Sequence, residues 1–407
     1  MKVCVLTHTF PRYKSDIAAA FMKEFSDGLV QAGNKVVVVT PFDPKFRRLD
    51  DSFKIVTYRY IWPDGLHILG YSQTMDKDVV LRKRAFLLLP FLIIFGTIAL
   101  FKVVKKEKVE IINVHWILPN GLMALIVSRL TGIPYIVTLP GTDAYLVHRY
   151  KLFGFIAKCI AQNSSGIISN SSWNLDRILQ LKVLGKKTEI ICYPTDVNKI
   201  KPSGDGLEEY RKRHDLNENN LIILAIGRFV YKKGFDYLIR AMPEVIRKYS
   251  EARLLIGGDG DLRRDLEELA RKLGVGDKVL FLGDIKRDEI NYYYNLADVM
   301  VAPSIVDKQG NVDGGPVVSF ESMACGKPQI VTNVLGVADV IKDGINGYIV
   351  PQKKPEAITI ALVKLLGSRD LRERMGKANR RLITTEFNTR SVGKKYTNFF
   401  KEIIALK

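Results

Sequence analysis

Short runs rich in valine and isoleucine alternate along the chain with longer segments in which apolar residues recur at helical spacing. This alternation is typical of parallel β-sheets whose strands are joined by helices. In the first half the runs predict strands at Val3–Thr7, Lys35–Thr40, Val109–His115, Tyr135–Leu139, Gly166–Ser169 and Thr188–Cys192. In the second half they predict strands at Leu221–Ile226, Arg253–Ile256, Lys278–Leu282, Val299–Ala302, Pro328–Thr332 and Gly347–Val350.

Segments of helical period fill the intervals, and they predict helices over Phe21–Gln31, Asp236–Lys248, Asp261–Leu273, Arg287–Leu296, Pro355–Leu366 and Tyr396–Leu406. A chain of 407 residues with two blocks of strands exceeds one ordinary domain. We therefore expect an α/β protein with two doubly wound, Rossmann-like domains, residues 1–195 and 196–389. The tail, from about residue 390 to 407, is expected to pack back on the first domain. Because such sheets bind ligands beyond the carboxyl ends of their strands, two facing sheets predict a cleft between the domains.

One segment, Ala85–Phe101, is far more apolar than its surroundings and reads AFLLLPFLIIFGTIALF. Cations flank it on both sides, at Arg82-Lys83-Arg84 and again at Lys102 and Lys105. Its length is at the lower limit of a membrane-spanning helix, but a span would put two halves of one sheet on opposite sides of the bilayer. Two interpretations remain open: a buried core helix, or a helix partly sunk in an anionic membrane interface.

The charge of the chain favours a phosphate-rich or membrane partner. The net charge is +19, and residues 1–190 carry 26 Lys and Arg against 14 Asp and Glu. No nucleic-acid-binding module is recognisable, so no nucleic-acid partner is expected. The four cysteines are widely spaced and the first residues read as a strand, which predicts a cytoplasmic protein. The apolar segment and its flanking cations add the expectation that it is peripheral on the inner face of the cell membrane.

The strongest chemical signal runs from the strand end Ala302-Pro303-Ser304 through a Gly-rich loop to a helix that begins near Val317. Backbone N–H groups at a helix start, here those of Val317 and Val318, bind anions such as a diphosphate. Seven residues separate Asp313 from Glu321, which places one carboxylate in the loop and one on the helix. Each can accept hydrogen bonds from sugar or ribose hydroxyls, although an acidic residue can also simply stabilise the helix dipole.

Two further loops follow predicted strands. Gly227-Arg228 leads to Lys233-Gly234, and an Arg and a Lys at a strand end can hold phosphate oxygens. The other loop, Gly257–Gly260, contains Gly258, which lets a ligand approach the backbone closely. Asp259 and Asp261 have the spacing of a metal-binding Asp-x-Asp pair. At the junction between a strand and a helix, however, turn and helix-cap roles are the better interpretation. We therefore expect no metal and no cofactor.

In combination these motifs resemble the retaining glycosyltransferases of group 1, family four, which have the GT-B fold and a Glu-(seven residues)-Glu motif. Phe281-Leu282-Gly283 and Glu321–Gly326 are also similar to that family. The resemblance implies that Arg228 and Lys233 hold the diphosphate of a nucleotide-sugar donor and that Glu321 binds its ribose. Asp313, which replaces the first Glu, would contact the transferred sugar. The second domain would bind the donor, and the first the acceptor.

The first half resembles the family through Val114–Gly121, which implies that His115 contacts the donor sugar or the acceptor; a core histidine is the alternative. Asp143 would contact the acceptor, while Pro140 stands where the family has a histidine. The backbone of Ser15–Ala18 would replace the family's Gly-Gly loop, and Pro316 replaces a loop glycine.

The function that this resemblance implies is transfer of a hexosyl-type sugar, with retention, to a glycan or lipid-linked acceptor in cell-surface polysaccharide or glycolipid synthesis. Peripheral contact with an anionic membrane would bring the protein to a lipid-linked acceptor. Two alternatives remain: a catalytically silent nucleotide-sugar-binding relative or scaffold, and a sugar-nucleotide epimerase of related fold. The epimerase would not need the Glu321 helix motif.

Overall fold

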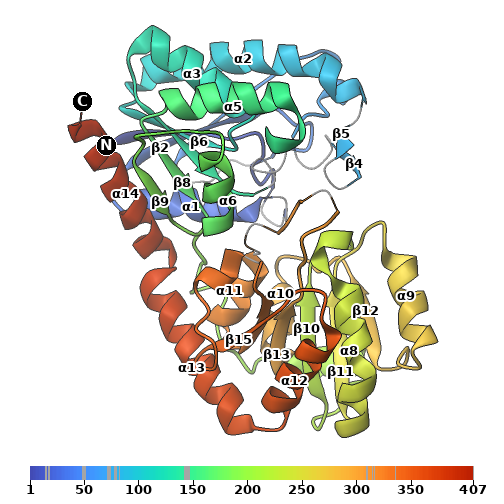
Figure 1. Ribbon diagram of the computed structural model, residues 1–407. Helices are drawn as coiled ribbons and strands as arrows, with labels where there is room; N and C mark the ends of the chain where they lie inside the picture. The colour runs from blue at the N-terminus through green and yellow to red at the C-terminus, as the bar shows by residue number, and fades with distance from the viewer. Residues whose placement is uncertain are drawn as a thin grey trace. The chain divides into compact units, whose positions relative to one another are not determined.

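The computed structural model describes residues 1–13, 16, 19–47, 52–70, 75–77, 80–81, 83–141, 147–308, 310–313, 315, 317–334 and 336–406. The chain forms two compact units (Figure 1). The first unit comprises Met1–Pro194 and Phe387–Lys407, and the second comprises Thr195–Glu386. The last part of the chain therefore belongs to the same unit as its beginning.

The first unit is built on a parallel sheet of seven strands in the order β3-β2-β1-β6-β7-β8-β9. Their bounds are β1 Lys2–Leu6, β2 Lys35–Pro41, β3 Lys54–Tyr58, β6 Ile111–His115, β7 Tyr135–Leu139, β8 Gly166–Ser169 and β9 Thr188–Ile190. A short antiparallel pair, β4 (Met75–Lys77) and β5 (Val80–Leu81), precedes the longest helix. Six of the seven strands were predicted, with ends within two residues of the observed ones. Strand β3 was not predicted, because it lies at the sheet edge and is only partly buried.

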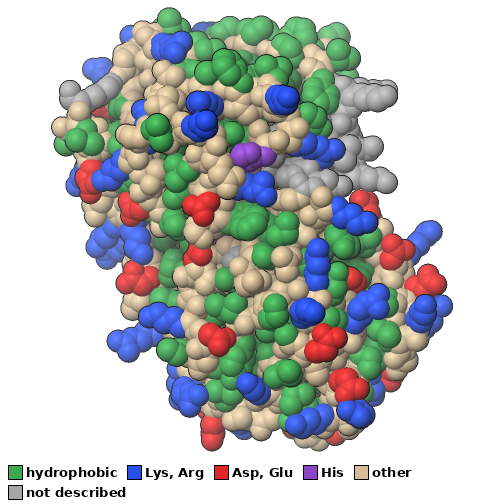
Figure 2. Space-filling model, viewed as in Figure 1, with side chains coloured by type: hydrophobic (Ala, Val, Ile, Leu, Met, Phe, Trp, Pro, Cys, Tyr) green, Lys and Arg blue, Asp and Glu red, His purple; other side chains and the backbone are tan. Residues whose placement is uncertain are grey.

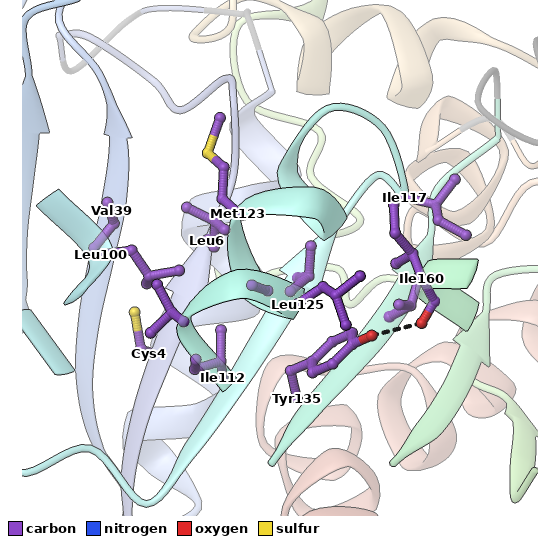
Figure 3. Packing of buried hydrophobic residues seen from close by; sticks show 14 of the residues in the cluster. Cys4, Leu6, Val39, Leu100, Ile112, Ile117, Met123, Leu125, Tyr135 and Ile160 are labelled. Atoms are coloured by element: carbon purple, nitrogen blue, oxygen red, sulfur yellow. Dashed lines mark hydrogen bonds between the residues drawn. The ribbon is translucent and has the colours of Figure 1, made fainter. Parts of the chain in front are cut away.

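Helices cover both faces of this sheet, because alternate residues of each central strand point to opposite sides. Cys4 and Leu6 of β1 join the core under one set of helices, which Figure 3 shows from close by. Val3 and Val5 join the core under the other set. Helices α2 (Lys83–Glu107), α3 (Asn120–Thr131) and α5 (Lys151–Asn163) contribute to the first core, while α1 (Ala20–Gln31) and α14 (Thr389–Ala405) contribute to the second. Figure 3 also shows the hydroxyl of Tyr135 donating to the carbonyl of Ile160, at 2.6 Å. The remaining elements are η1 (Asp64–Leu66) and α6 (Ser172–Leu179).

Helix α14 is held closely against α1. The two backbones touch where Gly28 meets Gly393: a Cβ on Gly393 would lie 1.9 Å from the carbonyl oxygen of Gly28. Asn34 then donates to the hydroxyl of Thr397 at 2.7 Å. Small residues permit this approach, and the apolar side of α14 closes the second core of the first unit.

The second unit has a parallel sheet of six strands in the order β12-β11-β10-β13-β14-β15. The strands are β10 Leu221–Ile226, β11 Ala252–Gly257, β12 Val279–Gly283, β13 Val299–Ala302, β14 Gln329–Thr332 and β15 Gly347–Val350. Its helices are α7 Leu207–Arg213, α8 Phe235–Lys248, α9 Arg263–Lys272, α10 Ile290–Leu296, α11 Val317–Ala324, α12 Pro355–Leu366 and α13 Arg369–Glu386, with short turns η2 (Tyr231–Lys233) and η3 (Gly336–Asp339). The expectation of two doubly wound, Rossmann-like domains is confirmed.

Helix α2 shows that the apolar segment is only partly a core helix. Leu92, Leu100, Val103 and Val104 are buried against the sheet. Among the described residues, Phe86–Glu107 is the one stretch long and apolar enough to cross a membrane, and 28% of its most apolar window is buried. The side of the helix away from the sheet therefore leaves several large apolar side chains exposed.

Candidate functional site

The predicted donor residues gather at the centre of the second sheet. Strand β10 is followed in the chain by β11 and β12 on one side, whereas β13 to β15 lie on its other side. The loops that leave β10 and β13 therefore diverge from the point at which the strand order reverses. In open α/β sheets, ligands bind at such a point. Arg228 and Lys233 lie in the first loop, and Asp313 lies in the second.

Two glycines allow close contacts between loops at this edge of the sheet: Gly234 between the loops after β10 and β13, and Gly258 between the loops after β11 and β10. Gly234 has a φ of +65°, and a Cβ there would lie 2.1 Å from the carbonyl oxygen of Pro303. Gly258 has a φ of +122°, and a Cβ there would lie 2.1 Å from the carbonyl oxygen of Gly227. The N–H of Gly258 donates to the carbonyl of Gly283 at 2.7 Å. Gly258 was predicted for ligand approach, and its observed contribution is the close contact between two strand-end loops.

The Lys233 ammonium forms an ion pair with the Asp313 carboxylate. Burial alone would raise the pKa of Asp313, but Lys233, with Lys232 and Arg228 nearby, outweighs that effect and lowers the pKa below its ordinary value. Arg228 itself is exposed at the end of β10. The structure thus brings three of the predicted residues into one electrostatic group.

Helix α11 begins at Val317, where the sequence placed its start. The side chains of Val317 and Val318 are half-buried in this first turn. One turn further, Glu321 lies almost fully inside the unit, with 1% of its side chain exposed. Glu321 is therefore held behind the helix start rather than projecting freely into solvent.

Glu321 has two partners that the sequence did not identify. Arg287, in the segment between β12 and α10, forms an ion pair with its Oε1. The buried hydroxyl of Tyr294 on α10 donates to Oε2 at 2.6 Å. Burial, and then the Glu321 charge, raise the pKa of Tyr294 well above its ordinary value. No spacing rule links these residues to Glu321, because the contacts depend on how α10 packs beside α11.

In the first unit, His115 ends β6 and is fully buried. Its Nε2 lies 2.8 Å from Oδ1 of Asn113, and its Nδ1 lies 2.7 Å from the hydroxyl of Tyr193. Burial lowers the pKa of His115 to about 3. Both ring nitrogens are thus occupied within the unit, and the arrangement is that of the core histidine, the alternative raised from the sequence. Contact between His115 and a sugar would require one of these hydrogen bonds to be given up.

Two family models match this chain. The model described as Glycosyltransferase Family 4 matches residues 18–199, and the model described as Glycosyl transferases group 1 matches residues 207–382. Together the two matches extend over most of both units. This chain belongs to the glycosyltransferases of group 1, family 4.

Relatives match this glycosyltransferase along nearly its whole length. An uncharacterized glycosyltransferase of Methanocaldococcus jannaschii is 25% identical over 98% of both chains. The GDP-mannose-dependent alpha-(1-6)-phosphatidylinositol monomannoside mannosyltransferase of Mycobacterium tuberculosis is 24% identical, also over 98% of both chains. A sucrose-phosphate synthase structure from Thermosynechococcus elongatus aligns over 100% of both chains with a TM-score of 0.79 and 20% identity. The fold of the glycosyltransferase is therefore GT-B.

Some predicted contacts of this glycosyltransferase lie outside the described residues. They are Asp143 and the loop positions Ser15, Ile17 and Ala18; Pro316, which replaces a loop glycine, also lies outside the described residues. Asp259, the first member of the apparent metal-binding pair, accepts from the N–H of Gly260 at 2.7 Å and pairs with Arg263 at 3.4 Å. This is the turn chemistry that the sequence favoured. Within the described ranges, no group of three or more His, Cys, Asp or Glu could hold a metal ion.

The side chains at the β10 and β13 loops can bind a ligand that carries both an anionic group and hydroxyl groups. Arg228 can present a planar fork to phosphate oxygens, and the Lys233 ammonium has three N–H donors, of which Asp313 uses one. The start of α11 adds the partial positive charge of a helix N-terminus. Buried behind it, Glu321 is an acceptor for hydroxyls. The residues are thus complementary to a nucleoside diphosphate.

Proposed function

We propose that this glycosyltransferase transfers a hexosyl-type sugar from a nucleotide diphosphate sugar to a glycan or lipid-linked acceptor, with retention of configuration. The observation that carries the proposal is the grouping of Arg228, Lys233, Asp313 and Glu321 around the switch point of the second sheet. The GDP-mannose dependence named for the mycobacterial relative supports a nucleotide-sugar donor.

In this proposal each residue has one role. Arg228 and Lys233 bind the diphosphate together with the N–H groups of Val317 and Val318, and Gly258 keeps the neighbouring loop close. Glu321 accepts hydrogen bonds from the ribose, while Asp313 contacts the transferred sugar. The Lys233–Asp313 ion pair supports this division, because it brings the proposed phosphate and sugar contacts together. No metal is needed, because cations already balance the diphosphate.

The proposed reaction proceeds on one face of the sugar. The acceptor hydroxyl attacks the anomeric carbon on the side from which the nucleoside diphosphate departs, and its proton passes to a phosphate oxygen of the leaving group. Negative charge grows on the diphosphate as the bond between the anomeric carbon and the diphosphate oxygen breaks. Donors already oriented by the fold, here Arg228, Lys233 and the start of α11, then supply the main catalytic stabilisation.

The acceptor is proposed to be glycan or lipid-linked and to be reached at the cytoplasmic face of an anionic membrane. Support comes from the outward side of α2, where Leu87 is 74% exposed and Ile94 is 54% exposed. Phe91, Phe95 and Ile98 extend this apolar stripe along the helix. Figure 2 shows hydrophobic side chains gathered at the end of the first unit where Figure 1 draws α2. A surface of this kind is typical of membrane-docking helices.

Cations continue the same stripe. Lys102 and Lys105 are exposed at the last turns of α2, four and seven positions after Ile98. They are placed to reach lipid headgroups while the apolar residues enter the acyl boundary. Each such cation contributes about 1 kcal/mol near an anionic surface, so attachment is reversible. The name of the mycobacterial relative, which acts on a phosphatidylinositol monomannoside, supports a lipid-linked acceptor of this kind.

The proposed donor is tested by thermal shift with UDP, GDP and ADP, followed by sugar transfer. One nucleoside diphosphate is expected to raise the unfolding temperature, since a ligand that binds only the folded state at a hundredfold excess over Kd contributes about 2.7 kcal/mol. The corresponding nucleotide sugars are then supplied with membrane extracts or glycans, and the anomeric configuration of the product is read by NMR. Inversion would contradict the proposed mechanism. Binding without hydrolysis or transfer would favour the silent nucleotide-sugar-binding relative.

A further inference from the structure

Both oxygens of the Glu321 carboxylate are held by side chains from outside its helix. Arg287 pairs with Oε1, and the Tyr294 hydroxyl donates to Oε2 at 2.6 Å. The two partners come from different elements, the segment after β12 and helix α10. Because Arg287 and Tyr294 each bind a different oxygen, they fix the plane of the carboxylate as well as its position.

This arrangement leaves part of the hydrogen-bonding capacity of the carboxylate unused. An ionised carboxylate has about four lone-pair sites, and the two partners use two of them. A buried carboxylate also needs a cation or several donors to stay charged, and Arg287 is the cation that pairs with Glu321. Arg287 reaches Glu321 from the carboxyl end of β12, the same sheet edge from which Arg228 and Lys233 extend.

We infer that Arg287 and Tyr294 are positioning residues that orient Glu321 toward the ribose of the donor nucleotide. The inference rests on the ribose role of Glu321 in the proposed function. The two side chains hold the carboxylate so that its remaining lone pairs face the ribose hydroxyls. Neither residue needs to touch the nucleotide: their effect on affinity passes through Glu321.

An effect of Arg287 on nucleotide affinity that acts through Glu321 is detected by comparing nucleotides with and without ribose hydroxyls in both wild type and variants. The nucleoside diphosphate with the largest thermal shift among UDP, GDP and ADP is compared with its 2′,3′-dideoxy counterpart by calorimetry. Wild type is expected to bind the ribonucleotide on the order of tenfold to a hundredfold more tightly, because hydrogen bonds to a charged group are strong. In Arg287→Gln this preference is expected to fall to a few-fold, while affinity for the dideoxy compound stays within about twofold of wild type.

Further variants separate positioning from folding. Arg287→Lys keeps a cation and is expected to recover part of the preference, and Tyr294→Phe is expected to lose less than Arg287→Gln. Arg287→Gln combined with Glu321→Gln should lose no more than Glu321→Gln alone, because both act on one contact. Arg213→Gln is the matched control. It removes an ion pair to Glu289, next to the start of α10, the helix that carries Tyr294, and leaves the contacts of Glu321 intact.

The outcomes distinguish this inference from the proposed function. A wild-type protein that binds both compounds equally would remove the ribose role of Glu321, and the positioning role with it. A wild-type preference that Arg287→Gln and Tyr294→Phe both retain would overturn the positioning role alone. Equal losses for the ribonucleotide and the dideoxy compound would also overturn it, because Arg287 would then act on another part of the nucleotide.

Discussion

Lys233 and Asp313 are 80 positions apart in the chain and form an ion pair between the loops that leave β10 and β13. The pair exists because Gly234 lets the first loop press against the backbone of Pro303. A proposed diphosphate contact and a proposed sugar contact are therefore linked electrostatically. Substitution of either residue should therefore change the electrostatic environment of the other.

Removal of either proposed diphosphate cation should slow turnover strongly. For Arg228→Ala and Lys233→Ala we expect kcat to fall on the order of 10²- to 10³-fold, as when a preorganised donor to a developing anion is lost. Steady-state kinetics with the identified donor measure the effect. Arg264→Ala, which removes an exposed cation from α9, should leave kcat nearly unchanged. Near-normal turnover in both site variants would rule out the assigned diphosphate site.

The two carboxylates should differ in what they control. Glu321→Gln is expected to weaken nucleoside diphosphate binding on the order of tenfold or more, because it removes a charged acceptor from the ribose. Asp313→Asn should instead alter the preference between donor sugars and change nucleotide affinity less. Calorimetry with the nucleoside diphosphate and kcat/KM for two nucleotide sugars check this. A Glu321→Gln variant with wild-type nucleotide affinity would exclude the ribose role.

Buried His115 should make the first unit sensitive to acid. Burial lowers its pKa from 6.5 to about 3 in the folded protein, so below pH 6.5 the unfolded chain binds a proton that the folded chain does not. Stability is therefore complete above about pH 6.5 and declines as the pH falls toward 3. Thermal unfolding across this range should show a shallower decline for His115→Gln than for wild type, with exposed His148→Gln as control. If the unfolding temperature declines equally with pH in wild type, His115→Gln and His148→Gln, the contribution of His115 is excluded.

Membrane docking should depend on the outward side of α2. Ile94→Glu is expected to reduce co-sedimentation with anionic liposomes several-fold at low salt, because a charge would enter the acyl boundary. Ile360→Glu is the matched control: Ile360 is 58% exposed, on α12 of the second unit. Raising the salt should release the wild-type protein, because its cations act within a Debye length of about 8 Å at physiological ionic strength. If the wild-type protein does not co-sediment with anionic vesicles at low salt, membrane docking is excluded and a soluble acceptor becomes the better proposal.

Much of the architecture could be predicted from the sequence because central parallel strands are buried on both faces and read as continuous apolar runs. Strands such as β10 and β13 were thus located closely. The edge strand β3 was missed because it is only partly buried and its sequence, KIVTY, mixes polar and apolar residues. Helix α10 starts three residues later than predicted, since helix ends are set by local packing that periodicity does not encode.

The sequence by itself determined which residue types stand at the strand ends, and hence the family, the GT-B fold and the candidates Arg228, Lys233, Asp313 and Glu321. Local order suffices for this, because a strand end and the loop after it are continuous in the chain. Only the tertiary structure decided the partners of these residues. Arg287 lies 34 positions before Glu321, and its contact exists because α10 packs beside α11. The surroundings of His115 were likewise a tertiary matter, because the hydroxyl that reaches its Nδ1 belongs to Tyr193, 78 positions away.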